Sequence, residues 1–497
     1  MKTSEKIFAY PDKLKGSAIA YGLVISATVS ILLLGVMQFV TSQIKYASHI
    51  ETREKAFHIA EGGVYFYRWY LAHEIEGKNQ QEIVDFWEGS PLGVNNAYIK
   101  DYLDNNGNKI GETEISVSFP LSNNYNIVEV SSVGKAISKP NVTRTIKIRL
   151  RRSIWSDFAY LSDASTCFDE AWTINGKIMS NEGVHFDGTA NNTVLSGVSS
   201  YDDINPFHTY NDKNGVWTLS ANPQSVFTAG TKFPVPKKDF NGVTASFQIL
   251  REEAMEPGGA TINDCTAAGC YFDNTGLGKR IILKDNDTFD ICTVNQVGNG
   301  SNQNRPKKYS KTSGSGTCND CSGDCLSSYS IPDEGVIFVE DNAWIEGMIN
   351  GKRITLAAAS VSDPANDANI YLGINNVKYT NTDGSDVIAM LSEGNIEILT
   401  SSSDDLEIDG ALLTQNGELV KAEYNPVCCG DGCLLGKNQI DIFGSVISKN
   451  GIDFGFHKDC PLLNNKRKIT YDNNLYLYPP PFFPADSFYF VDQWEEI

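Results

Sequence analysis

The most regular pattern in the chain is an unbroken apolar run near its amino end. Residues 16–43 contain no charged side chain, and four lysines precede them. In a helix, at about 1.5 Å per residue, such a run crosses a hydrocarbon core of about 30 Å. The lysines predict that the amino end stays in the cytoplasm and that everything after Lys45 lies outside. A secretory signal peptide is the alternative, but its apolar core spans only about 7–15 residues.

The apolar pattern continues beyond this run with helical spacing. From Ile44 to Leu71, apolar residues recur at intervals of three, four and seven, and charged residues fill the other faces. The sequence therefore predicts one continuous helix over residues 17–75, half of it in lipid and half amphipathic. Gly62 and Gly63 predict close packing or a local bend, because each costs about 1 kcal/mol relative to alanine in a helix.

Alternating apolar and polar positions follow the predicted helix. Three such runs cover residues 115–119, 127–130 and 142–150. They predict an antiparallel sheet packed on the outer half of the long helix. We place this small β subdomain at residues 76–152.

Beyond residue 152 the chain changes to short strands separated by Asn-Gly and Asp-Gly turns. A pattern of isoleucine, any residue, glycine, any residue and an apolar residue occurs four times, with an asparagine soon after each copy. Short strands without intervening helices predict a mainly β domain over residues 153–470, a parallel β-helix-like solenoid in which each coil stacks on the next. A β-sandwich is the alternative. The four copies begin at Ile174, Ile345, Ile408 and Ile442.

The carboxy-terminal residues 471–497 are rich in aromatic residues and proline. An extended strap packed across the solenoid is the interpretation we favour. The alternative is an exposed aromatic strip that binds a sugar or another subunit.

Cysteines occur only after the predicted membrane and helix region. On a chain exported from the cytoplasm they predict disulfides that hold glycine- and serine-rich loops, although the clusters at 318–325 and 428–433 also allow thiolate zinc half-sites. The odd count leaves one thiol unpaired, and spacing does not give the pairing. The disulfide candidates are Cys167, Cys265, Cys270, Cys292, Cys318, Cys321, Cys325, Cys428, Cys429, Cys433 and Cys460.

Composition narrows the classes of function. The chain has 497 residues and a formal charge of −20, and losing residues 1–16 would take the charge to about −22 because that segment has four lysines and two acids. This acidity argues against binding to nucleic acid or to an anionic lipid surface. We find no nucleophile elbow, phosphate loop or paired metal-binding histidines, so we expect no catalytic residues, no metal and no cofactor.

The start of the apolar run carries a family resemblance. Lys15-Gly16 before Ser17 is similar to a prepilin-peptidase site. The resemblance implies a cytoplasmic leader of residues 1–16, cleavage after Gly16 and methylation of the new amino-terminal Ser17.

The helix that follows resembles a second family signature. Residues 53–63 match the R..AF..AE pattern of PilX-type minor pilins and of the related K pseudopilin of type II secretion. Tyr21 stands where most pilins have a glutamate that pairs with a neighbouring subunit, and the K pseudopilin also lacks that glutamate. This departure fits a tip or initiator position. The motif residues are Arg53, Ala56, Phe57, Ala60 and Glu61.

These observations predict a minor pilin or pilin-like tip subunit of a type IV pilus-type filament, acting in assembly initiation, surface adhesion or both. The expected partners are other pilins through the amino-terminal helix, the prepilin peptidase and inner-membrane lipid, with a surface glycan or protein as a possible ligand. We expect a single-pass membrane protein that moves to the pilus tip and cell surface. The alternatives are a membrane-anchored β-helical carbohydrate-active enzyme and a passively anchored surface protein.

Overall fold

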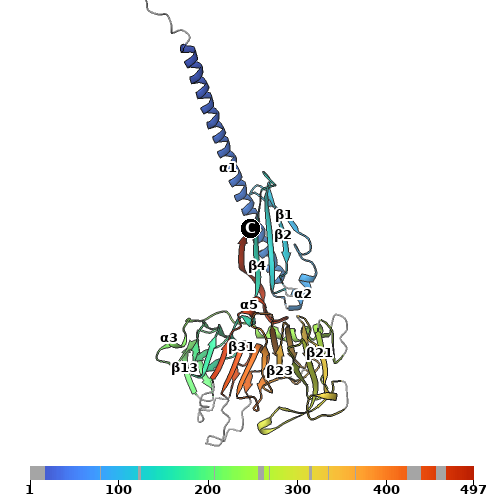
Figure 1. Ribbon diagram of the computed structural model, residues 1–497. Helices are drawn as coiled ribbons and strands as arrows, with labels where there is room; N and C mark the ends of the chain where they lie inside the picture. The colour runs from blue at the N-terminus through green and yellow to red at the C-terminus, as the bar shows by residue number, and fades with distance from the viewer. Residues whose placement is uncertain are drawn as a thin grey trace, which may run out of the picture.

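The computed structural model describes most of the chain after its first sixteen residues. A long helix leads into a small sheet, and a wide β domain lies at the far end (Figure 1). Gly16 and Cys428, Cys429, Cys433 and Cys460 lie outside the described residues. The described residues are 17–78, 80–120, 125–205, 208–255, 262–267, 269–312, 316–333, 335–363, 365–421, 438–454 and 466–497.

The predicted long helix is confirmed as α1 (Ser17–Ile75), which is continuous through Gly62 and Gly63. Its first half projects from the rest of the molecule (Figure 1). Its second half buries one face, because apolar residues spaced three and four apart lie on the same side of a helix. The short helix α2 (Gln80–Glu88) follows. The buried positions of α1 are Thr52, Ala56, Ile59, Ala60, Val64, Tyr67, Leu71 and Ile75.

The buried face of α1 packs against an antiparallel sheet, as the sequence predicts. The order of its five strands is β1-β2-β3-β4-β34. We call the second half of α1, α2 and this sheet the head (residues 44–154 and 485–497). The strands are β1 (Tyr98–Leu103), β2 (Lys109–Ser118), β3 (Ile127–Ala136), β4 (Thr143–Ile154) and β34 (Ala485–Glu496).

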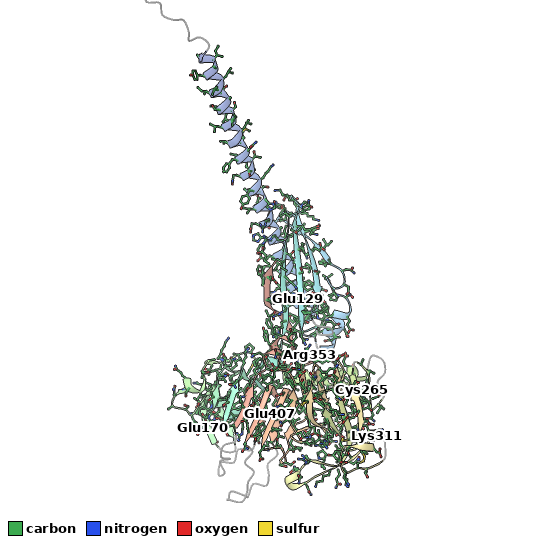
Figure 2. All side chains as sticks on the ribbon, in the orientation of Figure 1. Glu129, Glu170, Cys265, Lys311, Arg353 and Glu407 are labelled. Atoms are coloured by element: carbon green, nitrogen blue, oxygen red, sulfur yellow. A yellow bond between two sulfur atoms is a disulfide. The ribbon has the colours of Figure 1, made fainter. Side chains whose placement is uncertain are left out.

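The carboxy-terminal strand β34 differs from the predicted strap. Its residues pair with β4 instead of crossing the β domain. The physical reason is that β4 would otherwise leave an unpaired edge, and that β34 packs Tyr489 and Val491 against the core of the head. Only the preceding segment lies on the β domain, where Arg353 donates to the carbonyl of Pro479 at 2.6 Å and Phe483 is fully buried (Figure 2).

The remaining residues 155–484 form the β-body. Most of its strands pair in parallel, in stacked coils, so the described residues form the β-helix-like solenoid and not the sandwich. Before the middle of the β-body the strands are β5 (Tyr160–Ser162), β6 (Thr166–Phe168), β7 (Trp172–Asn175), β8 (Ile178–Ser180), β9 (Val184–Phe186), β10 (Thr189–Ala190), β11 (Val194–Ser196), β12 (Ser200–Asn205), β13 (His208–Asn214), β14 (Val216–Trp217) and β15 (Thr231–Lys232).

The strands after α4 belong to the same stack of coils. They are β16 (Asp264–Cys265), β17 (Gly269–Phe272), β18 (Lys279–Leu283), β19 (Thr288–Val297), β20 (Pro306–Ser310), β21 (Ser327–Ser330), β22 (Val336–Val339), β23 (Ala343–Ile349), β24 (Arg353–Ala358), β25 (Ile370–Leu372), β26 (Val377–Tyr379), β27 (Val387–Ser392), β28 (Ile396–Ile398), β29 (Asp405–Thr414), β30 (Leu419–Lys421), β31 (Gln439–Ser448), β32 (Ile452–Asp453) and β33 (Lys466–Thr470). The helices of the β-body are η1 (Trp155–Asp157), α3 (Pro223–Val226), η2 (Phe240–Val243), α4 (Thr244–Met255), η3 (Gly300–Asn302), η4 (Gly323–Cys325) and α5 (Asn474–Leu477).

In two copies of the repeat, the glycine marks a corner of the coil. Gly410 and Gly444 lie opposite each other in paired strands and have φ values of 150° and 146°. A Cβ on Gly444 would lie 2.0 Å from the carbonyl oxygen of Gly410, so the corner has no space for a side chain. The preceding isoleucines of these two copies, Ile408 and Ile442, are in register and fully buried. These two copies therefore occupy equivalent turns of one solenoid.

The coils do not stack in the order of the sequence. From β5 the chain adds β8, β11 and β15 in one direction, and then passes through α4 to the opposite end at β17. The second series returns until β31 pairs with β5 and β33 pairs with β7. In Figure 1, β31 accordingly lies between β13 and β21. The chain thus enters and leaves the β-body at the same central place.

Buried ionic contacts join the head to the β-body at that place. Arg151 is almost fully buried and donates to both carboxylate oxygens of Asp157. Lys238 of the β-body pairs with Asp486 of β34 at 2.5 Å and donates to the hydroxyl of Ser153 in β4 at 3.1 Å. A buried charge that is paired and hydrogen-bonded resists displacement, because separating the partners leaves it uncompensated. The contacts therefore hold the two parts in one orientation.

Candidate assembly helix and its membrane-end pocket

The first half of α1 exposes its apolar side chains. It is long and apolar enough to cross a membrane, and no other described helix meets that test. Tyr21, the residue in the position of the usual glutamate, is 69% exposed. Hydroxyls in this half donate to carbonyls one turn earlier, for example Thr28 to Val24 at 2.8 Å and Thr41 to Met37 at 2.7 Å. These bonds satisfy the hydroxyls inside the helix, as an apolar surrounding requires.

The predicted processing residues lie at the start of this helix. Ser17 is the first residue of α1, and Gly16 precedes the described part of the chain. The proposed cleavage site therefore stays a prediction from the sequence.

Two motif residues, Ala56 and Ala60, lie under strand β3 of the head. A Cβ on Gly134 of β3 would lie 2.0 Å from the carbonyl oxygen of Ala56 and 2.5 Å from the amide nitrogen of Ala60. Ser132 on the same strand donates to the carbonyl of Ala60 at 2.7 Å. Small residues on both sides allow helix and sheet backbones to touch. The alanines of the motif are packing residues, and Gly134 is the partner that sequence reasoning missed.

Helix residues Gly62 and Gly63 have the same role. A Cβ on Gly63 would lie 2.4 Å from the hydroxyls of both Ser132 and Thr113. A Cβ on Gly62 would lie 2.3 Å from the ring of Tyr102. Of the two predictions for this glycine pair, close packing is confirmed.

The other motif residues point away from this contact. The ring of Phe57 meets Trp494 of β34 edge to face at 6.2 Å between centroids. Glu61 lies 3.3 Å from Nδ1 of His58. Arg53 forms no ring contact and no ion pair with another described residue. It lines a pocket beside the helix. The motif therefore divides between packing inside the head and a surface that faces outward.

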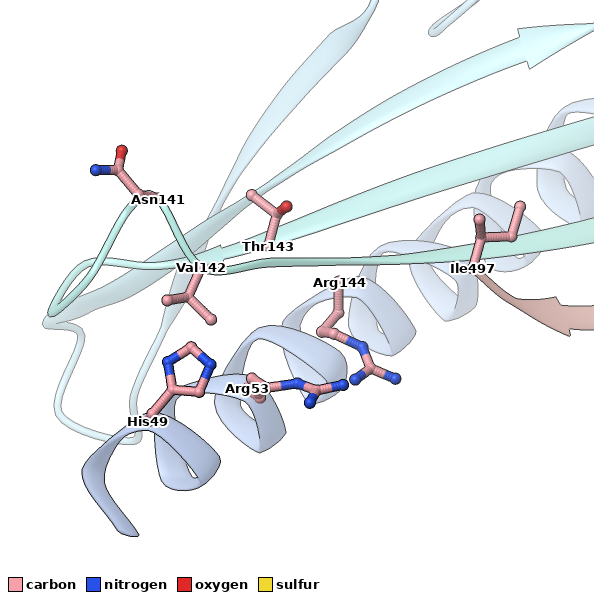
Figure 3. Close-up of a pocket in the computed structure, with 7 residues that line it drawn as sticks. All are labelled: His49, Arg53, Asn141, Val142, Thr143, Arg144 and Ile497. Atoms are coloured by element: carbon pink, nitrogen blue, oxygen red, sulfur yellow. The ribbon is translucent and has the colours of Figure 1, made fainter. Parts of the chain in front are cut away.

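We call this depression the membrane-end pocket. It has a volume of about 460 Å³ and lies between α1 and the start of β4, at the end of the head nearest the apolar half of α1 (Figure 3). Arg144 of β4 pairs there with Glu496 of β34, and its buried Nε has no hydrogen-bond partner among the described residues. The lining residues are His49, Arg53, Asn141, Val142, Thr143, Arg144 and Ile497.

Six cysteines form disulfides in the described part of the chain, as the exported location predicts. The pairs are Cys265–Cys270, Cys292–Cys321 and Cys318–Cys325. Because the 318–325 cluster is divided between two disulfides, the alternative of a zinc half-site there is wrong. The other candidate cluster lies outside the described residues.

Cys167 forms no disulfide with another described cysteine, and it lies beside a buried histidine. Its Sγ is 3.4 Å from Nδ1 of His185, and that ring also contacts Asp203 at 2.9 Å and Asp187 at 3.0 Å. Although the residue is partly open to solvent, desolvation and the carboxylates raise the pKa of the thiol to about 12. The protonated thiol is a poor nucleophile, so this arrangement does not resemble an activated cysteine site.

Asp405 begins strand β29 and Asp367 lies in the loop before β25, and a carbohydrate-active enzyme would have to use acids such as these. Asp405 accepts a hydrogen bond from the amide of Asn438 at 3.4 Å, and Asp367 accepts one from Asn416 at 3.2 Å. Among the described residues, no group of three or more His, Cys, Asp or Glu side chains comes together as a candidate metal site. Elsewhere in the β-body, burial raises the pKa of Asp409 to about 6.

Comparison with solved structures gives a likeness in fold. No family model and no curated protein matches the sequence. The structure is similar to the crystal structure of the competence-associated pilin ComZ from Thermus thermophilus, at 14% identity and a TM-score of 0.27. The match covers 90% of this chain and 97% of that chain.

Proposed function

We propose that this protein is a minor pilin or pilin-like subunit at the tip of a type IV pilus-type filament. Its amino-terminal helix anchors it in the membrane and then packs among other pilins, and its β-body is displayed outside. Initiation of assembly, adhesion or both are the expected roles. The proposal also takes Gly16 as the cleavage site and Ser17 as the methylated amino terminus.

The observation that carries the proposal is the division of α1. The apolar half has no partner within the described part of the chain, whereas the second half is covered by its own sheet. Apolar surface of this extent is stable only in lipid or against other apolar helices. A subunit that leaves the membrane for a filament needs both environments in turn.

The position of the β-body supports the tip. It lies at the end of the head opposite the free half of α1 (Figure 1). In a filament whose helices all point one way, a following subunit packs around the free half of α1, which the β-body leaves open. A preceding subunit would need the space beyond the head, which the β-body fills. The contacts of Arg151 with Asp157 and of Lys238 with Asp486 keep it there.

Mass spectrometry of the amino terminus tests the proposal. After co-expression with a prepilin peptidase, we expect the mature chain to begin at Ser17 and to carry an N-methyl group. The matched variant Gly16→Val should keep residues 1–16. An intact Met1 in the unaltered chain would favour passive anchoring, and a start beyond residue 43 would favour a secreted protein. Either result would overturn the pilin proposal.

A further inference from the structure

The membrane-end pocket gathers positive charge on an otherwise acidic protein. His49 and Arg53 lie one helical turn apart on the same face of α1, and Arg144 reaches the pocket from β4 (Figure 3). Lys139, in the adjacent turn between β3 and β4, donates to the hydroxyl of Ser48 at 2.8 Å. The formal charge of the chain is −20, so this positive region is local.

Of the two guanidinium groups in the pocket, that of Arg144 pairs with a described carboxylate and that of Arg53 does not. Glu496 pairs with Arg144, and the nearby Glu51 pairs with Lys55 at 2.6 Å. No described carboxylate pairs with Arg53, and no described acceptor meets the buried Nε of Arg144. Two guanidinium groups that line one pocket repel each other unless an anion lies between them. Arginine binds phosphate and carboxylate oxygens through paired N–H donors.

The height of the pocket on the helix favours lipid phosphate as that anion. Lys45 is the first charged residue after the apolar run, and His49 and Arg53 follow at about 6 and 12 Å along the axis. The headgroup layer beyond the hydrocarbon is about 5–8 Å thick on each side. Helical side chains lean toward the amino end, so the long side chain of Arg53 returns toward that layer. Exposed Tyr46 at the same level is typical of a membrane interface.

We infer that the membrane-end pocket binds the phosphate of an anionic lipid headgroup while the subunit is held in the membrane. Arg53 and Arg144 contact the phosphate oxygens, and His49 lies at the entrance. Binding fixes the rotation of the subunit about the long axis of α1 in the membrane before assembly. The general acidity of the chain does not prevent this contact, because charges more than about 10 Å away are largely screened by salt. The inference uses the membrane-inserted state of the proposed function but no step of filament assembly.

Native mass spectrometry of the full chain in neutral detergent tests this inference. Phosphatidylglycerol and phosphatidylcholine with the same acyl chains are added in equal amounts. We expect one phosphatidylglycerol to be retained in preference to phosphatidylcholine. The variant Arg53→Gln should weaken that retention at least about tenfold, because one charge-assisted hydrogen bond is worth about 1.5–3 kcal/mol. Retention of phosphatidylglycerol by Arg53→Lys should be weaker than that of the unaltered chain and stronger than that of Arg53→Gln.

Arg68→Gln is the matched control. Arg68 is exposed on the same helix, about 22 Å farther from the membrane, and its replacement removes the same charge. We expect its lipid retention to equal that of the unaltered chain. Because Arg53 is exposed and forms no ion pair with a described residue, its variants should fold, which an unchanged thermal transition verifies.

Three results would overturn the inference. Equal retention in Arg53→Gln would show that lipid binds elsewhere. Displacement of phosphatidylglycerol by an equal concentration of inorganic phosphate would show a site for a soluble anion. In a separate co-purification from cells that express partner pilins, loss of those pilins in Arg53→Gln together with unchanged lipid retention would assign Arg53 to a carboxylate of a neighbouring subunit. The lipid assay contains neither peptidase nor other pilins, so its failure is distinct from failure of the proposed function.

Discussion

The head and the β-body are stabilised in different ways. The head joins segments from both ends of the chain, since β34 pairs with β4 more than 300 residues earlier. The β-body is built mainly of coils that stack on neighbouring coils. Ala485 lies directly opposite Ile154, where the chain leaves β4. The β-body is therefore an insertion between two adjacent strands of the head, and it is separate from the apolar half of α1 that we propose as the assembly surface.

Gly134→Val should have the largest effect, a loss of stability confined to the head. The new side chain would collide with the backbone at Ala56 and Ala60, which cannot move without breaking helical hydrogen bonds. We expect the head to lose about 3 kcal/mol or more of its free energy of unfolding. Hydrogen exchange in β2, β3 and β4 measures this loss, and exchange in the β-body should remain unchanged.

Gly316→Val is the control for that prediction. Nothing lies within 4 Å of a Cβ at Gly316, so the same substitution should change stability by less than about 0.5 kcal/mol. Equal destabilisation of the head and the β-body by Gly134→Val would contradict their independence.

Gly444→Ala should have the next largest effect, confined to the β-body. The methyl group would meet the carbonyl of Gly410 at a backbone angle that favours glycine. We expect a loss of about 2–3 kcal/mol, seen as faster hydrogen exchange in β29 and β31. Gly351→Ala separates the two causes, since Gly351 has a φ of 64° but open space around it, and should lose only about 1 kcal/mol. Faster hydrogen exchange in the head of Gly444→Ala would contradict the independent stability of the head and the β-body.

Asp409→Asn should give the smallest effect, and only at neutral pH. The folded pKa of Asp409, about 6, lies above its ordinary 3.8 because burial disfavours the charged form. The folded state therefore holds its proton more tightly, and stability falls as pH rises through this interval. Asparagine avoids that loss and still accepts the amide hydrogen bond from Tyr379.

Thermal unfolding measures the effect of Asp409→Asn at two pH values. We expect the melting temperature to rise by up to about 2 °C at pH 7.5 and to be unchanged below pH 4. A difference of the same size at both pH values would show that the carboxylate charge is not its cause.

The local elements were predictable from the sequence because their signals are local. The apolar run before Lys45 and the helical spacing after it indicated α1, and alternation indicated β2, β3 and β4. The glycine pattern indicated the coils, although Val377 takes the place of the glycine in the coil that pairs with Gly347. That replacement, together with the crossover through α4, explains the irregular spacing of the repeat.

The long-range arrangement was not predictable in the same way. The sequences of equivalent coils do not show the order in which they stack. The residues of β31 therefore do not indicate that this strand pairs with β5. Arg53 and Arg144 line one pocket because α1 packs against the sheet. The helical spacing and the strand alternation do not show which residues meet at that contact. The partner of β34 was missed because an aromatic strand near a chain end fits either sheet equally well. The disulfide pairs depended on the folded positions of the loops.

The position of the β-body on assembled fibres is the measurement that tests the tip proposal most directly. Fibres from cells that co-express this chain with partner pilins can be labelled with gold-bound antibody against the β-body and imaged by electron microscopy. We expect label at one end of each fibre and none along the shaft. Regular labelling along the shaft, or label that stays on the cell envelope while fibres remain bare, would contradict a tip subunit.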